Sequence, residues 1–171
     1  VGAAIYAGPV QQSIKFQSSM AKVGTIADAT AVPLNALQKD IVNLSNEIGV
    51  NANNIAEDVY NAISAGQKTE DAVGFVGQAV KLAKGGFAET GQALDVMTTI
   101  LNAYGKESSE AEAVADMLIQ TQNKGKVTVA ELSSVMGKII PTANANNVAL
   151  EQLCAGYAIM TARGIAAAET T

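Results

Sequence analysis

One tetrapeptide in this sequence has the residue types and spacing of a catalytic motif. Ser19-Met20-Ala21-Lys22 matches the Ser-x-x-Lys pattern, in which one helical turn sets a lysine amine beside a nucleophilic serine. Enzymes that use this motif also need Ser-Asp-Asn and Lys-Thr-Gly elements, and this sequence contains neither. We therefore interpret Ser19 as a structural helix residue and Lys22 as a solvated one.

Two other patterns suggest chemistry at first sight. The segment 85–91, GGFAETG, is rich in glycine like a phosphate loop, but no strand pattern precedes it and no Gly-Lys-Ser/Thr follows. We interpret it as a turn between helices. The acidic pairs Glu57/Asp58 and Glu70/Asp71 are sequence neighbours, which point in different directions on a helix. Neither pair is expected to converge on a substrate.

Metal and thiol chemistry have few candidate residues. The chain has no histidine, and Cys154 is its single cysteine, so an internal disulfide is excluded and the usual zinc, haem and iron–sulfur ligand sets are missing. A reactive thiol needs an activating neighbour, so Cys154 is expected on or beside a buried helix face. We predict no catalytic, cofactor-binding or metal-binding residues, and no enzyme activity.

The composition describes a helical protein that must build its core from aliphatic side chains. Of 171 residues, 49% are hydrophobic but only 4% are aromatic, which fits a single module spanning residues 1–171. The net charge of −5 and the scattered lysines disfavour direct nucleic-acid binding. The longest apolar runs, at 1–10 and 155–160, fall well short of the roughly 18 residues of a membrane span. The abrupt apolar start and the final AAAETT suggest an excerpt from a longer protein.

Helix signals recur along the whole chain, and no alternating strand pattern competes with them. Apolar residues step by three and four between glycine or proline stops, as in amphipathic helices. Eight helices and a truncated ninth are expected, at about 9–28, 34–49, 55–66, 69–85, 94–105, 109–125, 128–141, 150–164 and 166–171.

Two capping boxes and one proline locate three of these boundaries more closely. Ser109 with Glu112, and Thr128 with Glu131, have the spacing of capping boxes, in which each residue satisfies a free N–H of the first turn. Pro141 is expected to end its helix because proline cannot continue the hydrogen-bond ladder.

The glycine stops are themselves periodic. Gly66 and Gly105 lie 39 residues apart, as do Gly125 and Gly164. This spacing suggests helix pairs of about 40 residues, which stack into solenoids because one pair cannot bury its own apolar face. Residue identity between the pairs is slight, so an irregular bundle of helical hairpins is the alternative. Both arrangements are all-α.

An ordered set of segments resembles a known family. The segments are FQSSMAKVGTIADAT, ALQKDIVNLSNEIG, IAEDVYNAISAGQKTEDAVGFV, ALDVMTTILNAYG and KGKVTVAELSSVMGKIIPTANANNVALEQLCAGYAIMTARGI, followed by AAAETT. Together, from about Ile14 to Thr171, they resemble the core region of the tape measure proteins of long-tailed bacteriophages. The family usually has serine or threonine where this chain has Ala149. Alanine cannot cap a helix, so this helix start is expected to be looser or to use Asn147.

The resemblance implies a virion protein of the phage tail, made in the host cytoplasm, that sets tube length, occupies the tube lumen and leaves ahead of the DNA. The implied partners are copies of itself, with a trimer expected, and the tail tube and baseplate or tail tip proteins. Small apolar positions such as Ala166, Ala167 and Ala168 would allow close helix approach in such an assembly. The frequent helix stops favour a folded module over an uninterrupted measuring shaft.

Two rival functions come from other classes. The module, or the apolar segment 1–10, could act on the host membrane and help DNA enter the cell. A cell-wall hydrolase is the enzymatic alternative, and the lack of histidine and of converging carboxylates argues against it.

Overall fold

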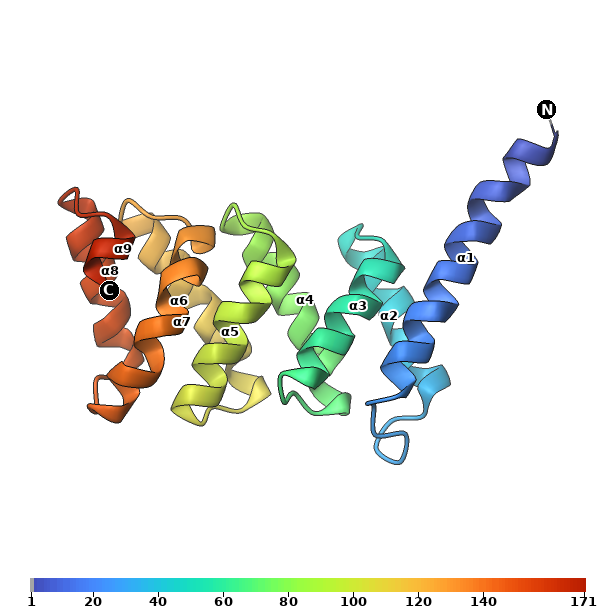
Figure 1. The fold of residues 1–171 in the computed structure, drawn as a ribbon, viewed down its shortest axis with the longest axis horizontal. Coiled ribbons are helices and arrows are strands. Elements are labelled where there is room, and N and C mark those ends of the chain that lie inside the picture. The colour runs from blue at the N-terminus through green and yellow to red at the C-terminus, as the bar shows by residue number, and fades with distance from the viewer. Residues whose placement is uncertain (1) are drawn as a thin grey trace. The chain divides into compact units, whose positions relative to one another are not determined.

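The computed structural model describes residues 2–171, with side chains from Gln11 onward. Every regular element in this described part is a helix, so the predicted all-α class is confirmed. The elements, labelled in Figure 1, are α1 (Gly2–Gly24), α2 (Leu34–Ile48), α3 (Ala52–Ser64), α4 (Thr69–Gly85), α5 (Thr90–Tyr104), the short 3-10 helix η1 (Ser108–Glu110), α6 (Ala111–Lys124), α7 (Val129–Ala145), α8 (Leu150–Ala162) and α9 (Ala167–Thr170).

The chain divides after Gly77 into two compact units, and α4 begins in the first unit and ends in the second. Each unit is described here by itself. That residues 1–171 form a single module therefore stays a prediction.

The first unit contains α1, α2, α3 and the start of α4. Helix α3 packs against both α1 and α2. The loop after α1 is tied to α4, because the Asp28 N–H donates to Thr69 Oγ1 at 2.9 Å. Its main buried apolar side chains are Met20, Val23, Leu37, Ile41, Ile55, Val59, Phe75 and Val76.

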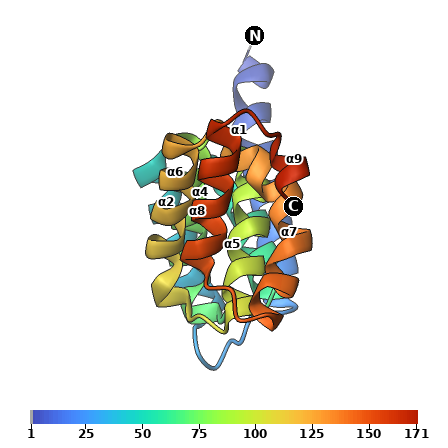
Figure 2. The ribbon, with the colours of Figure 1, turned by 90° about the vertical axis from the view of Figure 1, so that its left-hand side faces the viewer.

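The second unit is a stack in which helices two apart along the chain lie side by side. Helix α5 packs against α7, α6 against α8, and α7 against α9. Figure 2 shows α6 and α8 on one side of this unit and α5 and α7 on the other. Ser133 Oγ donates to Gln92 O at 2.8 Å, across 41 residues of sequence. Within this unit the helices are arranged as stacked hairpins, the solenoid-like alternative of the prediction.

Left-handed backbone conformations end several helices at the predicted glycine stops. Gly49, Gly66, Gly105 and Gly164 all have positive φ, which glycine adopts without steric cost. Two such positions carry other residues, Phe87 with φ 53° and Asn147 with φ 58°. Phe87 follows Gly86, where a Cβ would come within 2.4 Å of Val129 Cγ2. Gly86 is therefore needed for close packing, and the left-handed residue after it is a phenylalanine.

The prediction that Pro141 ends its helix is wrong. Helix α7 continues through Pro141 to Ala145. Pro141 is exposed, so water can reach the carbonyl that its missing N–H leaves without a helical partner. Beyond it, Ala143 is buried and Asn144 Nδ2 donates to Ala103 O at 2.7 Å. These tertiary contacts offset the cost of proline inside the helix.

One predicted capping box is confirmed and the other is wrong. Thr128 Oγ1 accepts from the Glu131 N–H at 3.2 Å, and the Thr128 N–H donates to Glu131 Oε2 at 2.7 Å. Ahead of α6, however, the Glu107 N–H donates to Glu110 Oε2 at 3.0 Å. The extra 3-10 turn moves the box two residues upstream of the predicted Ser109.

Helix α1 differs from its predicted bounds, whereas α8 begins, as expected, without a capping side chain at Ala149. Helix α1 begins upstream of Pro9 and ends at Gly24, earlier than the expected Asp28. Ala149 lies at the N-cap of α8 without a capping side chain, and its N–H donates to Gln152 Oε1 at 3.2 Å instead. Asn147 is the left-handed residue after α7 and does not take over this role.

No helix in the described part of the chain combines the length and apolar character that a bilayer span needs. The apolar segment 1–10, which carried the membrane hypothesis, lies outside the residues whose side chains are described.

Candidate functional site

The Ser19-x-x-Lys22 motif lies at a polar pocket of the first unit. The pocket has a volume of about 440 Å³ and is lined by Ser19, Lys22, Glu57, Tyr60 and Asn61. Its residues come from α1 and α3, which pack against each other.

The hydrogen bonds of Ser19 show what this motif does. The hydroxyl donates to Asn53 Oδ1 at 2.7 Å and lies 3.5 Å from Glu57 Oε1. A nucleophilic serine must give its proton to a base, and an amide oxygen is a poor one. The geometry therefore favours the structural interpretation, in which buried Ser19 ties α1 to α3.

The neighbouring carboxylates on α3 have different environments, as their adjacent positions predicted. Glu57 is exposed and faces the polar pocket, whereas Asp58 is half-buried. Burial, with the negative charge of Glu57 as a smaller cause, raises the pKa of Asp58 to about 6. The burial of Asp58 was not predicted, although its spacing of three and four residues from the buried Ile55 and Ala62 was a signal for it.

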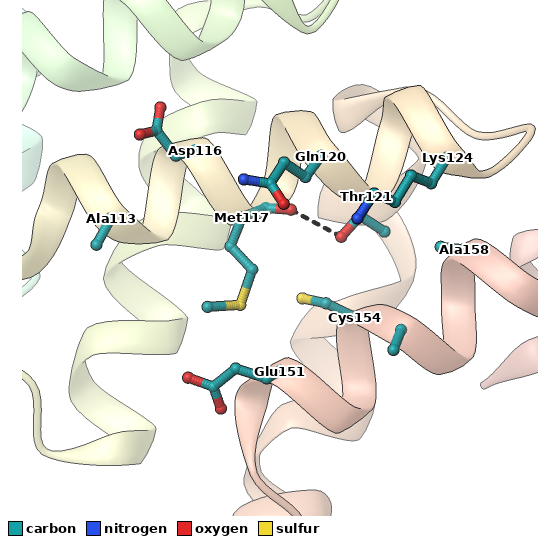
Figure 3. Close-up of a pocket in the computed structure, with 10 residues that line it drawn as sticks. Ala113, Asp116, Met117, Gln120, Thr121, Lys124, Glu151, Cys154 and Ala158 are labelled. Carbon is teal, nitrogen blue, oxygen red and sulfur yellow. Dashed lines mark hydrogen bonds between the residues drawn. The ribbon is translucent and has the colours of Figure 1, made fainter.

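A second hollow is an open groove between α6 and α8 in the second unit. One part of it has a volume of about 410 Å³, and an adjoining part of about 430 Å³ shares Lys124, Ala155 and Ala158 with it. Figure 3 shows Met117 of α6 and Cys154 of α8 projecting into the space between the two helices.

The two helices run parallel, and their ends meet closely. The Lys126 N–H, just after α6, donates to Thr161 Oγ1 in the last turn of α8 at 3.1 Å. A Cβ on Gly125 would lie 2.5 Å from the same oxygen. Glycine at this position thus lets the α6 end approach α8 and fixes one end of the groove.

Charged residues lie at both ends of the groove. Asp116 and Glu151 are near the N-terminal ends of α6 and α8, and Lys124 and Arg163 are at the C-terminal ends. Among the described residues, these four charges form no ion pair. Sequence reasoning missed the groove because its residues are ordinary on each helix and meet only when α6 packs on α8.

Cys154 is buried, as predicted, with 3% of its surface exposed. Burial raises the pKa of its thiol, and the nearby Thr121 hydroxyl offsets this only in part. A raised pKa leaves less thiolate, the nucleophilic form, so the environment of Cys154 suits packing.

The remaining candidates contribute no further site. Residues 86–89 form the turn between α4 and α5, as expected for the glycine-rich segment. Within the described residues, no three His, Cys, Asp or Glu side chains are grouped to hold a metal ion. The predicted lack of catalytic, cofactor and metal sites stays a prediction.

Comparison with known proteins gives one consistent result. The family model described as "Phage-related minor tail protein" matches residues 38–171. The chain is 36% identical over 143 residues to the "Probable tape measure protein" of Clostridium phage phiCD119, covering 81% of this chain. It is 24% identical over 159 residues to the "Tape measure protein" of Pneumococcus phage Dp-1, covering 93% of this chain.

These similarities cover only part of each relative. The matched region spans 15% of the phiCD119 protein and 14% of the Dp-1 protein. No solved structure matches the chain.

Proposed function

The chain belongs to the family of phage-related minor tail proteins, and from this premise we propose that it is a structural segment of a tail tape measure protein. In this proposal the segment takes part in tail assembly and length determination through helix–helix contacts. On ejection it leaves the tail tube ahead of the DNA and so serves DNA delivery into the host.

The observation that carries this proposal is the stack of short, capped helices. A measuring shaft is expected to be one long helix that rises 1.5 Å per residue. Here left-handed residues such as Gly66, Gly105 and Gly164 end the helices every few turns, and the helices fold back on each other. The segment is therefore a folded module of the ruler and not its shaft.

An in-frame deletion of residues 128–164 from the phage gene tests this proposal. The deletion removes α7 and α8 and exposes the faces of α5 and α6 that they cover, including the buried Leu101 and Leu118. We expect few or no infectious particles.

The opposing result is equally clear. If the region is measuring shaft, tails should shorten by about 55 Å, the helical rise of the deleted segment, and infectivity should be retained. Electron microscopy of tail lengths, with plaque counts, distinguishes the two outcomes.

The proposed partners follow from the same role. They are further copies of the chain, with threefold symmetry expected, and the tail tube and baseplate or tail tip proteins. The module would lie in the tube lumen or at the tail tip of the virion after synthesis in the host cytoplasm. Cross-linking of assembled tails tests this, because recovery of monomers alone would contradict self-association.

We propose no enzymatic role and no direct nucleic-acid binding. The Ser19 hydroxyl donates to Asn53, which supports a structural function of the one catalytic-like motif. A cell-wall degradation assay on the purified chain tests this, and measurable hydrolysis would contradict it. The membrane-active alternative includes segment 1–10, whose side chains lie outside the described part of the chain. A liposome leakage assay tests this alternative.

A further inference from the structure

We propose that the groove between α6 and α8 docks one amphipathic helix of another tail protein, which runs antiparallel to both walls. The proposal rests on the tail role only for the source of this helix. Its evidence is the shape, the apolar floor and the charge distribution of the groove.

The groove has the size of a helix-binding surface. Its lining on α6 runs from Ala113 to Lys124, a rise of about 16 Å, or three helical turns. The lining on α8 continues it past Ala158 to Arg163. A helix of about 15 residues would extend slightly beyond both ends.

The floor of the groove is apolar because α8 has no polar face in this region. From Leu153 to Ala162 this helix carries no charged residue, and its polar side chains there, Tyr157 and Thr161, are buried. Ile159 is nevertheless 54% exposed beside the exposed Ala155. A helix that is apolar on all sides is normally covered on all sides, so the free face of α8 indicates a missing neighbour.

The charges select the direction of the bound helix. Helices favour acidic residues in their first turn and basic residues in their last. An antiparallel helix would bring its acidic first turn to Lys124 and Arg163, and its basic last turn to Asp116 and Glu151. A parallel helix of the same type would place like charges together at both ends.

A second copy of this chain offers no free helix of this type among the residues that the structure describes. Only α4 and α6 carry acidic residues in the first turn together with a basic residue in the last. The apolar faces of both are buried, including Val76 and Val80 of α4 and Leu118 of α6. No helix of a second copy that the structure describes therefore fits the groove, and the proposal takes the partner helix from a different tail protein.

Two labelled peptides of about 15 residues test the proposal with the full 171-residue chain. Both have the same composition and the same Leu and Ala stripe at helical spacing. The first has glutamates in its first turn and lysines in its last, and the second has these charges exchanged. At low salt, fluorescence anisotropy should show the first peptide binding at least about tenfold more tightly, because the ion pairs at both ends change sign.

Two variants link binding to the groove. K124E combined with R163E should favour the charge-exchanged peptide at that end and reduce the tenfold preference. Both side chains are exposed, and K138E, at an exposed position of α7 outside the groove, is the matched control. A155W should block both peptides by filling the groove. Circular dichroism confirms that each variant is folded.

Several results would overturn the proposal. These are binding of neither peptide, equal affinity for both, or an unchanged preference in the charge variant. Concentration-dependent dimerisation that is lost in I159D would show that a second copy occupies the groove. None of these results affects the folded-module proposal, which the gene deletion tests separately.

Discussion

Replacing Gly125 with alanine should destabilise the protein through the close approach of α6 and α8. Gly125 has φ −97° and ψ −171°, an extended conformation open to any residue, so the backbone does not require glycine here. Space does. The new Cβ would lie 2.5 Å from Thr161 Oγ1, 2.9 Å from Thr121 O and 3.0 Å from Ala158 Cα.

The expected cost follows from these contacts. Thr161 is buried, and its hydroxyl accepts from the Lys126 N–H and donates to Tyr157 O, so moving it breaks at least one hydrogen bond. That loss costs about 0.5 to 1.5 kcal/mol, and overpacking adds about 1 to 3 kcal/mol. The reduced entropy of the unfolded chain offsets up to about 1 kcal/mol. G125A should therefore lower the free energy of unfolding by about 1 to 3 kcal/mol.

Urea unfolding followed by far-UV circular dichroism measures this change. The matched control is G156A in α8, where a Cβ meets nothing within 4 Å and alanine should stabilise the helix by about 0.5 to 1 kcal/mol. In a T161A background the closest clashing atom is absent, so G125A should cost about 1 kcal/mol less than in the natural chain. A free energy of unfolding of G125A equal to or above that of the natural chain would refute the reasoning.

Three further predictions concern single positions. F87G should raise the free energy of unfolding by about 0.5 to 1 kcal/mol, because it relieves a left-handed phenylalanine that is 79% exposed; lower stability would show that this side chain packs. Burial raises the pKa of Asp58 to about 6, so the folded state favours the protonated carboxyl. The stability that this preference provides is complete below the ordinary pKa of 3.8 and is lost as pH rises through 6. D58N should therefore be more stable than the natural chain by about 1 kcal/mol at neutral pH, after allowance for solvent screening, and equal to it in urea titrations at pH about 3.5. T128A should lower the free energy of unfolding by about 1 kcal/mol because it removes the cap of α7, whereas S109A should change it little. Equal losses in the two variants would show that Ser109 caps α6 after all.

Local rules predicted the fold where the chain itself decides the conformation. Helices end at Gly49 and Gly105 because glycine adopts the left-handed conformation freely. Pro141 was wrongly assigned because its cost is local, while the contacts that offset it, at Ala143 and Asn144, are tertiary. Ahead of α6 the local pattern was also insufficient, because the capping box forms at Glu107 and Glu110 and not at Ser109.

The candidate sites could be predicted only in part, because they form between helices distant in sequence. Ser19 was a catalytic candidate because Lys22 follows it three residues later, yet its hydroxyl donates a hydrogen bond to Asn53, 34 residues away. The groove needs α6 and α8 side by side, and the glycine spacing left stacked pairs and an irregular bundle both open. Residue types alone could not show that Met117 and Cys154 line one surface.

The side-by-side stacking in the second unit has a mechanical consequence. Each helix there is held mainly by its chain neighbours and by the helix two further along, so no contact network clamps the whole unit at once. Under tension from one end, such a stack should peel in small events. Each hairpin of about 40 residues would release about 130 Å of extended chain. A chain built in this way can pass from a folded body to a thread through many low barriers, which would serve the exit through the tail tube that we propose for it.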